Sequence, residues 1–193
     1  MTISPESNEA KNAASTVIVV IGASGDLAKK KTFPALFGLF ANDFLPERLR
    51  IIGYARSKLD KDAFRDKITS DKLGKAPKEP LGKFLDHCDY ISGQYDSADD
   101  FGRLKAEIEK YEKTFLDEAR QAGVNNQTRT RIFYMATPPS VFVPVAKSIK
   151  HGAYDPNATN RIVIEKPFGR DLASCRQFSR DFAELFKEHE VST

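Results

Sequence analysis

The sequence predicts an α/β fold with a doubly wound, mostly parallel sheet and helices on both of its faces. Short runs of β-branched and apolar residues alternate about five times with longer amphipathic stretches, as is typical of such sheets. The first run, residues 16–21, contains only Thr, Val and Ile, which favours a strand buried on both faces. No internal repeat or low-complexity segment interrupts the alternation.

The other elements are expected in a regular order after that strand. Apolar side chains at helical spacing predict helices near residues 33–40, 59–70, 101–111, 141–150 and 172–188. Short β-branched or aromatic runs predict strands at residues 50–55, 89–92, 131–136 and 161–164. Residues 74–80 carry two prolines and are predicted to form a loop.

The chain length predicts one folded domain. Its 193 residues fit a single domain of ordinary size. Residues 1–15 are expected to be a disordered N-terminal tail, residues 16–190 to form the domain, and residues 191–193 to be an atypical terminus that breaks the pattern.

Composition argues against several classes of protein. The 30 Lys and Arg residues against 27 Asp and Glu leave a net charge of +3, which favours neither a nucleic-acid nor a membrane partner. The longest wholly apolar stretch, residues 17–21, is far shorter than the roughly 20 residues of a membrane span. Two distant cysteines predict neither a disulfide framework nor a metal site. With no targeting signal at the N-terminus, a cytoplasmic location is expected.

A glycine-rich turn follows the first strand and opens a helix. It reads Gly22-Ala23-Ser24-Gly25-Asp26-Leu27-Ala28 and continues into three lysines that end at Lys31. Such glycines permit a tight turn and a close approach to a pyrophosphate, and the helix N-terminus attracts phosphate charge. An ordinary strand-to-helix turn also uses glycine, but the position between a strand and a helix near the N-terminus favours nucleotide binding.

Arg56 follows the second strand and bears on the choice of coenzyme. Enzymes that bind NAD usually carry an acidic residue here, whereas arginine suits the 2′-phosphate of NADP, because its planar fork can donate two hydrogen bonds to a phosphate. A solvated arginine at a strand end is the alternative. Together with the glycine turn, Arg56 favours NADP.

Two later strands end in residues that face the same edge of the sheet. Thr137-Pro138-Pro139 follows the fourth strand, and these rigid prolines can wall a nicotinamide or simply end the strand. Lys166 follows the fifth strand and can bind a phosphate or a sugar hydroxyl, or be solvated. The histidines follow no strand, and His87, His151 and His189 are each expected to be surface residues rather than general bases.

Three segments resemble glucose-6-phosphate dehydrogenase of the eukaryotic, fungal type. They are GASGDLAKKK at residues 22–31, GYARS at 53–57 and EKPFGRD at 165–171. The first and third signatures, in this order and about 140 residues apart, are highly specific, and the similarity extends over residues 16–190. The resemblance implies a Rossmann-like coenzyme domain that lacks the family's larger β+α domain.

The resemblance also implies a reaction and a set of site residues. The reaction is the NADP-dependent oxidation of glucose 6-phosphate to 6-phosphogluconolactone, which opens the pentose phosphate pathway. Arg56 is implied to bind the 2′-phosphate, Lys166 to contact both substrate and coenzyme, and Pro167 to shape their relative placement. The implied cofactor-binding residues are Gly22, Ala23, Ser24, Gly25, Asp26, Leu27, Ala28, Lys31, Arg56, Tyr134 and Lys166.

The family's catalytic histidine, its substrate phosphate ligands and its dimer interface lie beyond the similarity seen here. The chain is therefore expected to be truncated and to contain no catalytic residue. Glucose 6-phosphate is expected to bind weakly, and homo-oligomers are expected of the full-length family. An NADP-binding fragment with no turnover of its own is the alternative function. A short-chain-type reductase, which would use a Tyr-x-x-x-Lys pair, is disfavoured.

Overall fold

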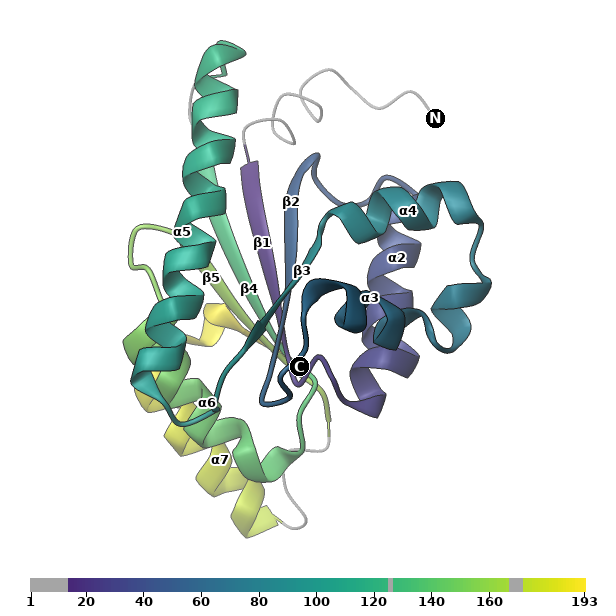
Figure 1. Ribbon diagram of the computed structural model, residues 1–193. Coiled ribbons are helices and arrows are strands. Elements are labelled where there is room, and N and C mark those ends of the chain that lie inside the picture. Colours follow the sequence, from purple (N-terminus) through teal and green to yellow (C-terminus); the bar gives the residue numbers. More distant parts are fainter. Residues whose placement is uncertain (1–13, 125–126, 167–171) are drawn as a thin grey trace.

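The computed structural model describes residues 14–124, 127–166 and 172–193. Six strands form one sheet in the order β3-β2-β1-β4-β5-β6, and all neighbouring strands are parallel (Figure 1). The strands are β1 (Ala14–Ile21), β2 (Arg48–Ala55), β3 (Cys88–Ser92), β4 (Thr128–Met135), β5 (Thr159–Ile164) and β6 (Val191–Ser192). The predicted doubly wound α/β fold is confirmed, and the strand order reverses between β1 and β4.

Helices cover both faces of this sheet. The longer ones are α2 (Phe33–Ala41), α3 (Lys61–Thr69), α4 (Lys78–Asp86), α5 (Ala98–Gln121), α6 (Phe142–Ser148) and α7 (Leu172–Leu185). Shorter turns are η1 (Ala28–Thr32), η2 (Lys72–Lys75), η3 (Pro139–Val141), η4 (Ile149–Ala153) and η5 (Glu188–Glu190). In the described part of the chain, no helix is long and apolar enough to cross a membrane.

The core consists of two apolar layers separated by the sheet. Val17 and Val19 pack with α5, α6 and α7 on one face, while Ile18 and Val20 pack with α2, α3 and α4 on the other (Figure 1). All four side chains are buried, so β1 is covered on both faces as its composition predicts.

Strand β4 is covered less evenly than β1. Phe133 and Met135 are fully buried in the layer of α5, α6 and α7. Ile132 and Tyr134 belong to the opposite layer and are only half-buried. The tyrosine side chain therefore lies at a partly open region near the carboxyl end of the sheet.

Several boundaries differ from the expectation. Strand β1 begins at Ala14, because Ala14 and Ser15 extend its pairing with β4, so these two residues belong to the sheet rather than the tail. Val191 pairs with Ile162 and begins β6, a strand too short for periodicity to reveal. Helix α4 occupies part of the expected loop, since proline is tolerated in a first helical turn, and helix α7 ends at Leu185.

Candidate functional site

The turn after β1 brings the ends of β1 and β4 into close approach. Gly22 has φ of 86°, a conformation that suits glycine, and its amide donates to the Tyr54 carbonyl at 2.8 Å. A Cβ on Gly22 would lie 2.5 Å from the Ala136 carbonyl oxygen. Gly22 is therefore required by the packing of the protein itself.

The helix that follows presents unpaired amides at the same edge. The amide of Gly25 donates to the Gly22 carbonyl at 2.9 Å, and that of Lys29 donates to the Gly25 carbonyl at 3.1 Å. Because the Lys29 bond is the first of the helix, the amides of the three preceding residues, 26–28, have no partner within it. Amides in this position can bind an anion.

Gly25 differs from Gly22 in what its missing side chain leaves open. A Cβ on Gly25 would meet only the Gly22 carbonyl oxygen, at 3.1 Å, and its φ is not positive. Gly25 also lines two adjacent cavities, which share Ala136, Thr137 and Pro138. The space beside the helix start is therefore open to both cavities.

We call the first of these hollows the β2-side cavity. It has a volume of about 350 Å³, and Arg56, Ser57 and Tyr95 line it. The Arg56 guanidinium carbon lies 5.2 Å from the centroid of the Tyr95 ring. The Ser24 and Ser57 hydroxyl oxygens are 3.0 Å apart, which ties the glycine turn to the end of β2. No carboxylate in the described ranges forms an ion pair with the exposed Arg56.

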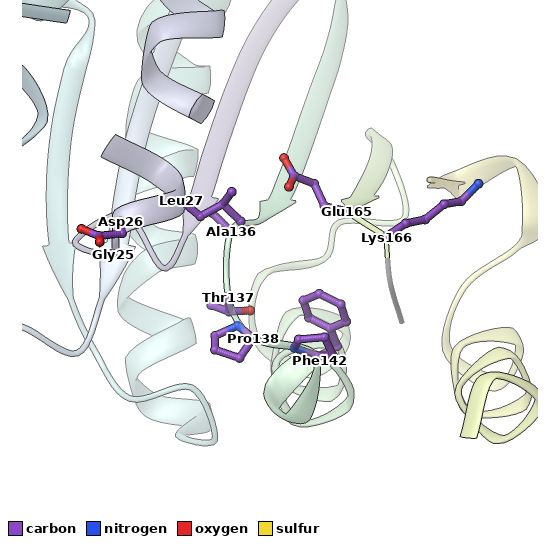
Figure 2. Close-up of a pocket in the computed structure, with 10 residues that line it drawn as sticks. Gly25, Asp26, Leu27, Ala136, Thr137, Pro138, Phe142, Glu165 and Lys166 are labelled. Atoms are coloured by element: carbon purple, nitrogen blue, oxygen red, sulfur yellow. The ribbon is translucent and has the colours of Figure 1, made fainter. Parts of the chain in front are cut away.

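We call the second hollow the β5-side cavity (Figure 2). It has a volume of about 490 Å³ and combines an apolar wall, which includes Leu27, Pro138 and Phe142, with Glu165 and Lys166. Figure 2 shows the Lys166 side chain extending away from the Gly25 turn. This cavity combines the apolar wall with polar side chains, which also include Asp26 and Thr137.

Tyr134 does not line the β5-side cavity itself but contacts Glu165, which does. Its hydroxyl donates a hydrogen bond to Glu165 Oε1. Burial, followed by the nearby Glu165 carboxylate, raises the pKa of Tyr134 to about 12, so the phenol remains protonated at neutral pH.

Thr137 carries an unpaired polar atom at the point where the strand order reverses. The residue is 6% exposed and lines both cavities. Its buried Oγ1 has no hydrogen-bond partner within the described residues. Such atoms are rare in folded proteins, and this one lies in the crevice where ligands of doubly wound sheets bind.

Most of the sequence-predicted site residues meet at this edge. Those that line one or both cavities are Gly22, Ser24, Gly25, Asp26, Leu27, Arg56 and Lys166. Ala23 and Ala28 are buried beneath the turn. Lys31 is exposed on η1 and is not among the residues that line either cavity. Pro167 lies outside the described residues.

Asp26 is a less obvious neighbour for a phosphate. Its side chain is 76% exposed and pairs with Lys30 at 3.1 Å and with Lys29 at 3.7 Å. The Lys30 ammonium, with a smaller contribution from Lys29, holds the pKa of Asp26 below its usual value. The two lysines offset the negative charge of Asp26 beside the helix N-terminus.

Tyr95 and Glu165 are among the cavity residues that the sequence did not single out. Tyr95 lies in the segment after β3, so the rule applied to the other strand ends would have found it. Glu165 directly follows β5, where only its neighbour Lys166 was predicted to bind a ligand.

The histidines lie away from both cavities. His87 packs on Phe40 with ring centroids 5.3 Å apart, and its Nδ1 lies 3.0 Å from the Leu49 carbonyl, before β3 begins. His151 is bonded within its own helical turn, and His189 is exposed in η5.

A Tyr-x-x-x-Lys spacing, of the kind a short-chain-type reductase would use, does occur at Tyr54 and Lys58. Tyr54 is fully buried, and its hydroxyl donates to the Gln94 carbonyl at 2.7 Å. It is therefore not accessible for proton transfer to a substrate.

A parallel sheet of this order, with a glycine turn and two cavities where the order reverses, defines a dinucleotide-binding domain of the Rossmann type. Residues 19–192 match the family described as the NAD binding domain of glucose-6-phosphate dehydrogenase. The chain belongs to this family, which confirms the resemblance seen in its motifs.

Individual relatives agree with this assignment. Glucose-6-phosphate 1-dehydrogenase of Emericella nidulans is 46% identical over 178 residues, covering 91% of this chain and 33% of the relative. Glucose-6-phosphate 1-dehydrogenase 5, cytoplasmic, of Arabidopsis thaliana is 43% identical, covering 96% and 36%. A solved glucose-6-phosphate dehydrogenase in complex with its substrate glucose-6-phosphate superposes with a TM-score of 0.80 at 39% identity, covering 92% and 36%. The chain thus spans about a third of the length of these relatives.

Proposed function

We propose that this chain binds NADP⁺ and forms the coenzyme half of a glucose-6-phosphate dehydrogenase. The complete enzyme oxidises glucose 6-phosphate to 6-phosphogluconolactone at the entry to the pentose phosphate pathway. The observation that carries the proposal is the exposed Arg56 guanidinium beside the β2-side cavity, which forms no ion pair with a described carboxylate. A cytoplasmic location is proposed with it, in line with the Arabidopsis relative named cytoplasmic.

Arg56 supports NADP⁺ over NAD⁺ through charge and geometry. A 2′-phosphate carries a negative charge that an arginine can bind with two hydrogen bonds, whereas a free ribose hydroxyl is usually bound by an acidic residue at this position. The hydroxyls of Ser24 and Ser57 border the same cavity and provide further donors.

The remaining residues are suited to bind either the diphosphate of the coenzyme or its nicotinamide end and the substrate. The amides of residues 26–28 are positioned to bind the diphosphate, and Gly25 leaves room for it. The apolar wall of the β5-side cavity can exclude water from the nicotinamide, which accepts a hydride when the coenzyme is bound. Lys166 can bind the substrate from the border of that cavity.

Binding without turnover is the second candidate function for this chain. None of the described histidines lines either cavity, and Lys166 is the one residue for which the family resemblance implies substrate contact. An exposed lysine contributes little to the binding of a phosphate in water, and a general base typically contributes about 10²–10⁴-fold to the rate. Homo-oligomers are proposed for the longer relatives.

Calorimetry with NADP⁺ and NAD⁺ tests the coenzyme assignment. Arg56→Ala is expected to weaken NADP⁺ binding by about 1.5–3 kcal/mol, through lost hydrogen bonds to charge, and to leave NAD⁺ binding nearly unchanged. Arg120→Ala, which changes an exposed arginine on α5, is the matched control. Equal losses for both coenzymes would exclude a 2′-phosphate role for Arg56.

Absorbance at the NADPH band tests the second candidate. The purified chain is expected to form no NADPH from glucose 6-phosphate above background. Turnover by the chain, in a preparation free of host enzyme, would show that the chain itself contains a general base.

A further inference from the structure

A third cavity, with a volume of about 520 Å³, lies between helices α2 and α4. We call it the α2–α4 cavity. Its lining comes from the last turn of α2, the connection from α2 to β2, helix α4 and the residue just after α4. Because these segments lead into the amino ends of β2 and β3, the cavity lies at the opposite edge of the sheet from the glycine turn. It shares no lining residue with the β2-side and β5-side cavities.

One part of the wall is apolar and preformed. Phe40, Leu45 and Pro80 line it. The Phe40 ring packs against the rings of Phe84 and His87, with centroids 5.6 and 5.3 Å away, and Phe84 is fully buried. These contacts hold the Phe40 ring in place, so the apolar body of a small ligand can pack on it without rearrangement.

The imidazole of His87 adds a hydrogen-bond acceptor to this wall. Its Nδ1 lies 3.0 Å from the Leu49 carbonyl oxygen. A carbonyl oxygen can only accept, so in the neutral ring this contact places the proton on Nδ1 and leaves Nε2 as an acceptor. The imidazole therefore favours a ligand that carries an N–H or O–H donor.

Carboxylates outnumber cations in the lining. Asp43, Glu47 and Glu79 line the cavity, against Lys83. The Lys83 ammonium already donates to Glu79 Oε1 at 2.9 Å. The lining thus offers mainly acceptors and negative charge, which attract a cation and repel a phosphate. This composition excludes a second coenzyme or sugar-phosphate site and favours a ligand with a positive charge.

We propose that the α2–α4 cavity binds a small amphiphilic amine. Its apolar body packs on Phe40 and Leu45, and its ammonium donates hydrogen bonds to Glu47 and His87. The volume of the cavity falls within the roughly 300–1,000 Å³ of small-molecule sites. A primary ammonium supplies three donors and the positive charge, and an aromatic or branched apolar body matches the rest of the wall.

Three small probes separate the apolar body from the charge. They are 2-phenylethylammonium, 2-phenylethanol and 3-phenylpropionate, which share a phenyl ring and a short chain but differ in charge. The ammonium is expected to bind with a dissociation constant of about 1 mM. It should bind about tenfold more tightly than the alcohol, as for hydrogen bonds to charged groups, and the carboxylate should bind more weakly than either. NMR titration of the isotope-labelled chain should show the largest amide shift changes at Phe40, Leu45 and His87.

Variants assign the preference to the carboxylate and the affinity to the apolar wall. Glu47→Gln keeps the size of the side chain and removes its charge, so it should reduce the preference for the ammonium over the alcohol about threefold to tenfold. Leu45→Ala should weaken the ammonium and the alcohol alike, by about threefold, because it removes apolar contact. Glu109→Gln, which changes an exposed carboxylate on α5, is the matched control and should keep the wild-type preference.

Three results with the wild-type chain would overturn the inference without any variant having to fold. They are equal binding of the ammonium and the carboxylate, shift changes that centre on the glycine turn, and no shift changes at about 10 mM ammonium. An unchanged preference in Glu47→Gln would overturn the contact between the ammonium and Glu47. None of these titrations contains NADP⁺, so their outcome is independent of the coenzyme assignment.

Discussion

The two ends of the sheet differ in whether their positively charged side chains form ion pairs. Toward the amino end, Arg131 of β4 donates to both carboxylate oxygens of Glu112 at 2.7 Å and to the Ala153 carbonyl at 2.8 Å. Arg129 pairs there with Asp155 at 2.7 Å. At the carboxyl end, Arg56 and Lys166 form no ion pair with any described carboxylate.

This difference separates structural charges from those that we propose to bind a ligand. Arg131 is fully buried and Glu112 is 2% exposed, so each depends on the other for the hydrogen bonds that water no longer supplies. Arg56 and Lys166 retain their water and have donors available for a ligand. A cation that the protein leaves unpaired beside a cavity is therefore a better guide to function than a charged residue with all its partners in place.

The largest expected effect lies at the amino end. Glu112→Ala should reduce the free energy of unfolding by about 3–5 kcal/mol, because the buried Arg131 loses its two hydrogen bonds to Glu112 and keeps only Asp155, 3.6 Å away, as an ionic partner. Glu109→Ala, an exposed carboxylate on the same helix, should change it by less than about 0.5 kcal/mol. Denaturant titration measures both.

A double variant tests whether the lost stability comes from the broken ion pair or from a general disruption of the fold. Glu112→Leu combined with Arg131→Met removes both charges and should recover most of the loss. Similar, small effects of Glu112→Ala and Glu109→Ala would mean that the buried pair does not stabilise the amino end.

The two glycines of the β1 turn provide the next largest contrast. Gly22→Ala should destabilise the fold by about 1–3 kcal/mol, because alanine is strained at positive φ and its Cβ would contact the Ala136 carbonyl. Gly25→Ala should leave stability nearly unchanged and weaken NADP⁺ by about 1–3 kcal/mol, since a methyl group overfills the ligand space. Thermal unfolding and calorimetry together check the pair. Unchanged coenzyme affinity in Gly25→Ala would show that the phosphate does not bind at this turn.

The smallest expected effect is a pH dependence at the amino end. Burial alone would raise the pKa of Asp155, but the Asn157 amide and the Arg129 and Arg131 guanidiniums together lower it below its usual value. A carboxyl with a lowered pKa stabilises the fold above its unfolded pKa, and this stabilisation is lost as the pH falls through the folded pKa. Stability should therefore fall below about pH 4.

Asp155→Asn isolates that contribution. Its unfolding free energy should depend less on pH than that of the wild-type chain over about pH 2–5. Identical pH profiles for the two chains would show that Asp155 does not carry the effect.

Much of the fold was predictable because it rests on local periodicity. The β-branched run at residues 16–21 indicates a buried strand, and the glycine turn after it predicts a nucleotide-binding helix start, both without any tertiary information. Strand β6 was not predictable in this way, since its two residues become a strand only by pairing with β5.

The partners of the charged residues were harder to predict. Glu112 falls on the buried stripe of α5 formed by Phe101, Leu104, Ile108 and Phe115, so its spacing signals a buried carboxylate, but no local pattern identifies Arg131 as its partner. The Tyr134–Glu165 and Arg56–Tyr95 contacts likewise join segments that only the folded sheet brings together.

The most direct test of the contrast between the two ends is an NMR titration of the isotope-labelled chain with NADP⁺. The account predicts that the largest amide shift changes occur at Ser24, Gly25 and Arg56, while the amides of Arg129 and Asp155 stay where they are. The largest changes at the amino end, or no changes around Gly25 at saturating NADP⁺, would contradict it.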